Sequence, residues 1–71
     1  NSKFVTAMAQ SLTNRLTEDQ PVDKIDQLYR LTLGRTPTPH ELQLGGVFLQ
    51  ENSWLDYAQV LLISNELWFI D

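Results

Sequence analysis

The sequence predicts a small all-α domain, folded as a four-helix orthogonal bundle. Its 71 residues are 42% hydrophobic, which suits one domain of modest core size rather than two. Glycine and proline occur only three times each. Between them, apolar residues recur at spacings of three and four, the period of an amphipathic helix. We therefore expect one domain over residues 1–71, with helices over about residues 2–17, 21–33, 39–51 and 54–68.

The first predicted helix, residues 2–17, has one apolar stripe on an otherwise polar surface. Residues that share this helical face are Phe4, Val5, Met8, Leu12 and Leu16. We expect the stripe to pack inward, as in an ordinary amphipathic surface helix.

The second predicted helix begins at Pro21, because proline suits the first turn and Asp23 lies near the positive end of the helix dipole. Its expected inward residues are Val22, Ile25, Leu28, Tyr29 and Leu33. Gly34 follows the last apolar position, where a left-handed C-terminal cap favours glycine. The helix is therefore expected to end there.

The third predicted helix starts with a capping box. Thr38 would be the N-cap, Pro39 the first helical residue and Glu41 the acid that reaches back to the Thr38 amide. The segment from Gly34 to Glu41 is therefore expected to form a corner between two helices rather than a reactive site.

Gly45 and Gly46 lie inside the third predicted helix, where each should cost about 1 kcal/mol relative to alanine. Close approach of another helix is the favoured explanation. A hinge, or a backbone that contacts a ligand, is the alternative.

The fourth predicted helix follows two N-cap candidates, Asn52 and Ser53, and it is apolar on nearly all sides. One face carries Trp54, Tyr57, Ala58, Leu61, Leu62, Asn65 and Trp68, and the other carries Val60, Ile63, Leu67 and Ile70. A domain of this size can hardly surround its own last helix. One hypothesis is that Val60, Ile63 and Leu67 dock onto the rest of a longer chain or onto a second copy. The other is that the first helix covers them as core.

Two further features of the chain have candidate roles, one in ligand binding and one in an ion pair within the chain. Trp54, Tyr57 and Trp68 share a helical face, which is more typical of core but could stack on a carbohydrate. Arg35 follows the Gly34 cap, and we expect it to pair with Glu66 near the end of the last helix.

Charge and composition exclude several functions. Residues 36–71 hold five acids and no lysine or arginine, and the net charge is −4, so we expect no nucleic-acid partner. No apolar run is long enough to insert in a membrane. The single histidine, His40, lacks convergent partners, and neither a nucleophile elbow nor a phosphate loop is present. We therefore expect no enzyme activity, no metal and no cofactor.

The order of short motifs along the chain resembles a known family, the C-terminal domain of unknown function of large planctomycete cytochrome C domain-containing proteins. The similar stretches are Leu28-Tyr29, Leu33-Gly34-Arg35, Pro37-Thr38, Glu41-Leu42, Phe48-Leu49 and Leu61 through Trp68, which includes Asn65 and Glu66. The opening NSKFV is also similar. Leu67 and the Gly45-Gly46 pair depart from the family pattern, in which phenylalanine and alanine are usual.

The resemblance implies a context rather than a chemistry. It implies that the chain is the C-terminal fragment of a long, exported multidomain protein in the bacterial cell envelope or outside the cell. The cytochrome motif is absent from these 71 residues, so no haem is carried over. The expected function is a non-catalytic structural or interaction module that packs against the rest of its parent, and the alternative is a carbohydrate-binding accessory module.

Overall fold

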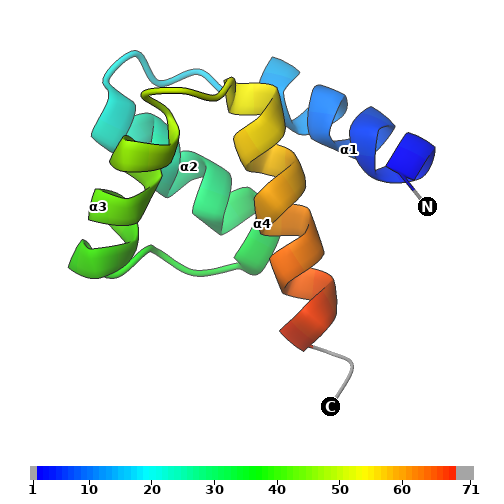
Figure 1. The fold of residues 1–71 in the computed structure, drawn as a ribbon. Coiled ribbons are helices and arrows are strands. Elements are labelled where there is room, and N and C mark those ends of the chain that lie inside the picture. The colour runs from blue at the N-terminus through cyan, green and yellow to red at the C-terminus, as the bar shows by residue number, and fades with distance from the viewer. Residues whose placement is uncertain (1, 69–71) are drawn as a thin grey trace.

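The computed structural model describes the backbone of residues 2–68 and the side chains of residues 3–65. Four helices form a small all-α bundle, as predicted, and they are α1 (Ser2–Asn14), α2 (Pro21–Leu33), α3 (Pro39–Phe48) and α4 (Trp54–Trp68). α4 packs against both α1 and α2, while α3 packs against α2 (Figure 1). The described residues contain no strand.

α1 ends at Asn14, earlier than the predicted Thr17. The amides of Thr17 and Glu18 donate to the side-chain oxygen of Gln27 on α2, at 3.0 and 3.2 Å, instead of to helical carbonyls. The Gln27 amide in turn donates to the Thr17 hydroxyl at 3.1 Å. The Gln27 side chain thus satisfies backbone N–H groups that would bond to helical carbonyls if α1 continued. It also connects the linker after α1 to α2.

The α2–α3 corner has the predicted caps. Gly34 is the C-cap of α2 with φ 71°, the left-handed conformation that residues other than glycine rarely adopt. Thr38 accepts from the Glu41 amide and Glu41 reaches back to the Thr38 amide, which completes the capping box. Pro21 and Pro39 each occupy the first turn of a helix, as expected.

α3 ends at Phe48, before the predicted Glu51. The amides of Gln50 and Glu51 donate to carbonyls three residues back, at 3.2 and 3.3 Å, which tightens the chain into a turn. α4 then starts after Ser53, whose hydroxyl accepts from the Asp56 amide at 3.1 Å. Ser53 is therefore the capping residue of the Asn52-Ser53 pair.

The core lies where α4 meets α1 and α2. Its buried apolar residues are Ala9, Ile25, Leu28, Tyr29, Tyr57, Ala58 and Leu61. Two alanines, Ala9 on α1 and Ala58 on α4, are completely buried. Small side chains at these positions suit two helices that pack closely, and α1 and α4 are such a pair.

Three expected inward residues are in fact largely exposed, so the prediction was wrong for them. On α1, Phe4 and Met8 are exposed, and the buried position is Ala9. On α2, Val22 is exposed, while Ile25, Leu28 and Tyr29 are buried as predicted. α1 therefore turns a narrower face to the core than its apolar stripe indicated, since the stripe is wider than the contact that one partner helix can cover.

Candidate functional site

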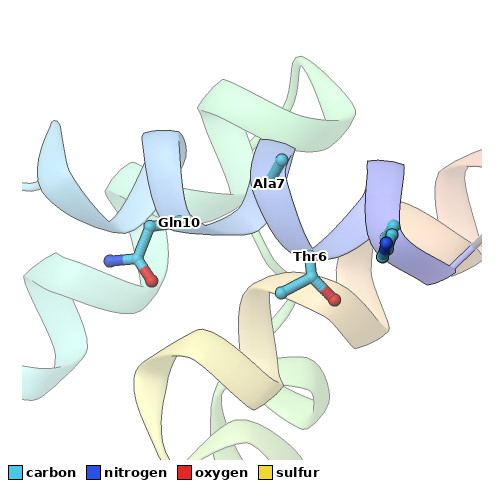
Figure 2. A pocket seen from close by; sticks show the side chains of 4 residues that line it. Thr6, Ala7 and Gln10 are labelled. Carbon is cyan, nitrogen blue, oxygen red and sulfur yellow. The ribbon is translucent and has the colours of Figure 1, made fainter.

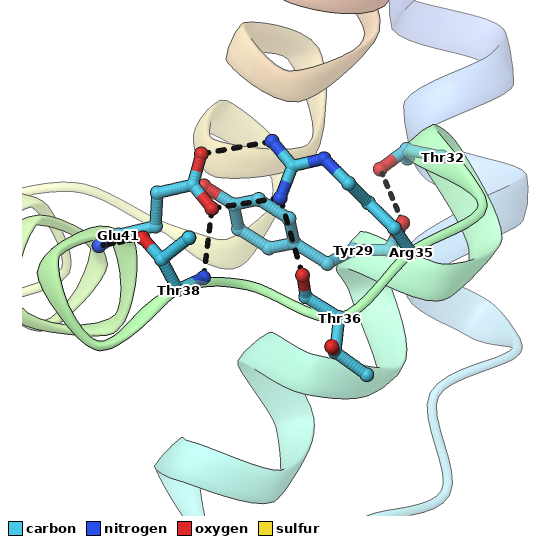
Figure 3. A network of polar contacts seen from close by, with 6 residues as sticks. All are labelled: Tyr29, Thr32, Arg35, Thr36, Thr38 and Glu41. Carbon is cyan, nitrogen blue, oxygen red and sulfur yellow. Dashed lines mark hydrogen bonds and ion pairs between the residues drawn. The ribbon is translucent and has the colours of Figure 1, made fainter.

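An ion pair holds the corner between α2 and α3 (Figure 3). The two terminal nitrogens of Arg35 donate to the two carboxylate oxygens of Glu41, at 2.8 and 2.9 Å. Arg35 also donates to the Thr36 carbonyl at 3.1 Å, and its guanidinium lies 5.6 Å from the centre of the Tyr29 ring. This two-pronged geometry is the strongest form of an arginine–carboxylate contact.

Glu41 takes part in two structures at once, the ion pair and the capping box. Its Oε1 atom accepts from Arg35 and also from the Thr38 amide at 2.8 Å. The hydrogen bonds from Arg35, and next that from the Thr38 amide, lower the pKa of Glu41 from 4.5 to about 2. The same pairing raises the pKa of Arg35. Both groups therefore remain charged across the physiological range.

The sequence predicted a pair of Arg35 with Glu66, and the structure shows Arg35 paired with Glu41. The side chain of Glu66 lies outside the described residues, and the two donating nitrogens of Arg35 are both engaged with Glu41. Asn65, the neighbouring residue of the family-like motif, is half-buried on α4. The corner is thus closed locally, by residues six apart in the chain.

Stability should depend on pH through Glu41. Because folding lowers its pKa, its contribution is present above the unfolded value of 4.5 and is lost as pH falls toward about 2. We expect the free energy of unfolding, measured in urea, to fall through this window in the wild type. Arg35→Ala should flatten the fall, because it removes the main cause of the shift. Parallel profiles for the two proteins between pH 5 and pH 2 would contradict the assignment.

A groove of about 220 Å³ opens between α3 and α4. The backbones of these two helices approach each other only sparsely, unlike α4 with α1, which explains why space remains there. Residues that line the groove are mostly apolar, and they are Tyr29, Glu41, Leu44, Gly45, Phe48, Tyr57, Val60, Leu61 and Ser64. Phe48 and Tyr57 join the two helices through a ring contact of 5.6 Å between centroids.

Tyr57 reaches across the base of this groove toward Gly45. A Cβ added at Gly45 would collide with the Tyr57 hydroxyl, would lie 3.0 Å from its Cζ and would lie 3.3 Å from Cδ1 of Ile25. The favoured explanation of the glycine pair, close approach of another helix, is thus confirmed at Gly45. The atoms that come close are side-chain atoms of Tyr57 and Ile25 rather than the backbone of another helix. A Cβ added at Gly46 would meet no atom from another part of the described structure within 4 Å, so close approach does not explain Gly46.

The Tyr57 hydroxyl is buried without a hydrogen-bond partner among the described residues. Tyr29 is a polar neighbour of this hydroxyl, but the two groups do not reach hydrogen-bond geometry. Burial raises the pKa of Tyr57 strongly and that of Tyr29 as well, so both hydroxyls stay protonated. Tyr57 interacts weakly with Tyr29 but has no well-formed hydrogen bond, which is costly in a folded interior.

Both helices that form the groove carry exposed apolar residues, of which Leu44 and Val60 line the groove itself. On α3, Leu44 and Val47 are 55% and 58% exposed, and on α4, Val60 and Ile63 are 42% and 49% exposed. Val60 and Ile63 are thus only partly covered by the rest of the described structure, which favours the docking hypothesis over the core alternative. Leu67, the third residue of the proposed surface, lies outside the described side chains. We call Leu44, Val47, Val60 and Ile63 the α3–α4 surface.

The two described aromatic residues of α4 are not exposed for stacking on a ligand. Tyr57 is only 4% exposed, and Trp54 is partly buried against it in an edge-on contact with centroids 6.1 Å apart. The Lys24 ammonium lies 4.6 Å from the centre of the Trp54 ring. The side chain of Trp68 is outside the described part of the chain. Two of the three aromatic residues named for carbohydrate stacking are therefore engaged within the bundle.

A second hollow lies on α1, and it is shallow and open. Lys3, Thr6, Ala7 and Gln10 line it, and Figure 2 shows Thr6 on the side of α1 that faces α4. Thr6 accepts a hydrogen bond from Gln59 of α4 at 3.1 Å. Thr6 thus contributes to the packing of α1 on α4, and Gln10 donates to Asn14 on its own helix at 3.5 Å.

Reactive side chains do not converge in the described residues. His40 is exposed in the first turn of α3. No group of three or more histidine, aspartate or glutamate side chains in this part of the chain is arranged to hold a metal ion. No described helix is both long and apolar enough to cross a bilayer.

The fold and its surface define a small all-α bundle with an apolar groove between its last two helices. Searches with this chain against protein-family models, curated proteins and solved structures find no match.

Proposed function

We propose that the chain is a non-catalytic helical interaction module that packs through α3 and α4 against another part of a larger protein. The observation that carries the proposal is the α3–α4 surface. Leu44 of α3 and Val60 of α4 line the groove and are exposed, and Val47 and Ile63, three residues further along the same helices, are exposed as well. Most of the remaining described apolar residues pack on the core. Several large apolar side chains left exposed on neighbouring helices are typical of interaction sites.

The motif resemblance supports the same proposal and adds a context. In that context the partner surface belongs to the parent chain of a large exported bacterial envelope protein. The Arg35 and Glu41 pair would then have a structural role, since it fixes the angle at which α3 presents Leu44 and Val47. The described residues give no support to the carbohydrate-binding alternative, because Tyr57 is buried and Trp54 is partly buried against it.

Cysteine labelling can test the proposal, because the 71 residues contain no cysteine. Val60→Cys places a thiol on the α3–α4 surface, and Val22→Cys places one at an exposed site on α2. In the isolated module both should react readily with a maleimide. In the full-length gene product we expect Val60→Cys to be protected at least tenfold, about the effect of 1.4 kcal/mol, while Val22→Cys still reacts.

Mass spectrometry of the labelled peptides would separate these sites from any cysteine elsewhere in the full-length product. Equal labelling rates of Val60→Cys in the isolated module and in the full-length product would refute the packing proposal.

A further inference from the structure

The groove between α3 and α4 has features beyond exposed apolar area. It combines apolar walls, Leu44 and Val60 among them, with a buried hydroxyl, that of Tyr57, which has no partner in the described structure. A buried donor left unsatisfied lowers stability, so a group that accepts its hydrogen bond would be favoured there. The groove therefore suits an occupant that is apolar but carries an acceptor.

The size of the groove limits what can occupy it. Its volume of about 220 Å³ lies below the range of about 300–1,000 Å³ typical of small-molecule pockets. A single large side chain from a polypeptide fits this size better, in the way that interface anchors fill small pockets. Leu44 and Val60, which line the groove, and the exposed Val47 and Ile63 further along the same helices would then contact the neighbouring turns of the same segment.

The net charge of the chain indicates the polar chemistry of that segment. The last 36 residues hold five acids and no lysine or arginine. Asp56 lies one turn before Val60 on α4, while Glu41 is already neutralised by Arg35. A second copy of this chain would bring the same net charge of −4 to the interface, which disfavours it. A basic segment is complementary.

The secondary structure of the groove indicates how the segment is held. Strand addition requires an open sheet edge, and the described residues contain no strand. A groove between two helices is the arrangement that accepts the apolar face of a third helix.

From these observations we propose that the α3–α4 groove binds an amphipathic helical segment with basic polar positions. One apolar anchor of that helix enters between Leu44 and Val60, and an acceptor next to the anchor takes a hydrogen bond from the Tyr57 hydroxyl. Because the hydroxyl is buried, side chains that line the groove have to move as the anchor enters. This inference rests on the proposed interaction function and specifies the chemistry of the partner.

The test uses a synthetic helical peptide with leucines at positions i, i+4 and i+7 and lysines elsewhere, followed by NMR of the isotope-labelled chain. Resonance shifts should be confined to residues around the groove. Leu44→Asp should abolish binding, whereas Val22→Asp should retain it. Both variants add one negative charge, so equal binding to both would mean that attraction is electrostatic only and would overturn the proposal. Equal binding of a matched peptide with glutamates in place of the lysines would also overturn the proposal, because it would show that the partner need not be basic.

Tyr57→Phe examines the hydroxyl. We expect it to raise the melting temperature, because the unpaired group is removed, and to weaken peptide binding about fivefold to tenfold, as loss of one hydrogen bond does. Unchanged affinity would overturn the role of the hydroxyl. Absence of peptide binding, combined with protection of Val60→Cys in the full-length product, would reject this inference and leave the proposed function standing.

Discussion

Leu28→Ala should unfold the isolated domain or leave it barely stable. Leu28 is completely buried at the centre of α2 and belongs to the core that α4 covers. Truncation of a buried leucine to alanine costs about 2–5 kcal/mol. A domain of this size has a total stability of only about 3–5 kcal/mol. The loss is therefore comparable with the whole free energy of unfolding.

Urea unfolding followed by circular dichroism measures this effect. Val22→Ala is the matched control on the same helix, because Val22 is largely exposed, and it should change stability by less than about 0.5 kcal/mol. Similar unfolding midpoints for Leu28→Ala and Val22→Ala would show that the core assignment of α2 is wrong.

Gly45→Ala and Gly46→Ala should change stability in opposite directions, although they are neighbours in one helix. At Gly45 the new methyl group would collide with the Tyr57 hydroxyl and crowd Ile25. Overpacking of this kind costs about 1–3 kcal/mol, more than the helix propensity of alanine returns. At Gly46 the new methyl group would meet no neighbouring atom within 4 Å. Only the gain in helix propensity from glycine to alanine remains, about 1 kcal/mol.

Thermal unfolding of the two variants beside the wild type gives the comparison directly. A lower midpoint for Gly45→Ala and a higher one for Gly46→Ala are expected. If both variants were stabilised, the Tyr57 ring could not lie against α3 as the structure has it.

The helix ends that local sequence determines could be predicted well. Gly34, Thr38 and Glu41 act through contacts within a few residues, and the expected cap and capping box are both present. The ends of α1 and α3 could not be placed as well. α1 stops where Gln27, from a different helix, takes the amides of Thr17 and Glu18. That contact spans nine and ten residues and leaves no local pattern.

The choice of partners and faces was harder to predict than the helices themselves. Arg35 follows a cap and has several acids within possible reach, and only the folded corner selects Glu41. Phe4, Met8 and Val22 are apolar at helical spacing and yet exposed. Periodicity identifies an apolar face, but the position of the neighbouring helix decides how much of that face is covered.

The groove itself is only partly visible in the sequence. The all-round apolar character of α4 pointed to Val60 and Ile63, which are indeed exposed. Leu44 and Val47 were missed, because the partners of α3 are set by tertiary packing. The signal that could have found them is the same as for α4, since α3 is also apolar on more than one face. Its adjacent Gly45-Gly46 pair marked the position where Tyr57 enters.

The central claim is that the α3–α4 surface lies outside the folded core, and the melting temperature of the double variant Val60→Asp, Ile63→Asp tests it most directly. Both residues are more than 40% exposed, so we expect cooperative unfolding within a few degrees of the wild type. Leu61→Asp, at a buried position of the same helix, should abolish folding. If the double variant is also unfolded, Val60 and Ile63 belong to the core, and the account of this surface as a docking site is wrong.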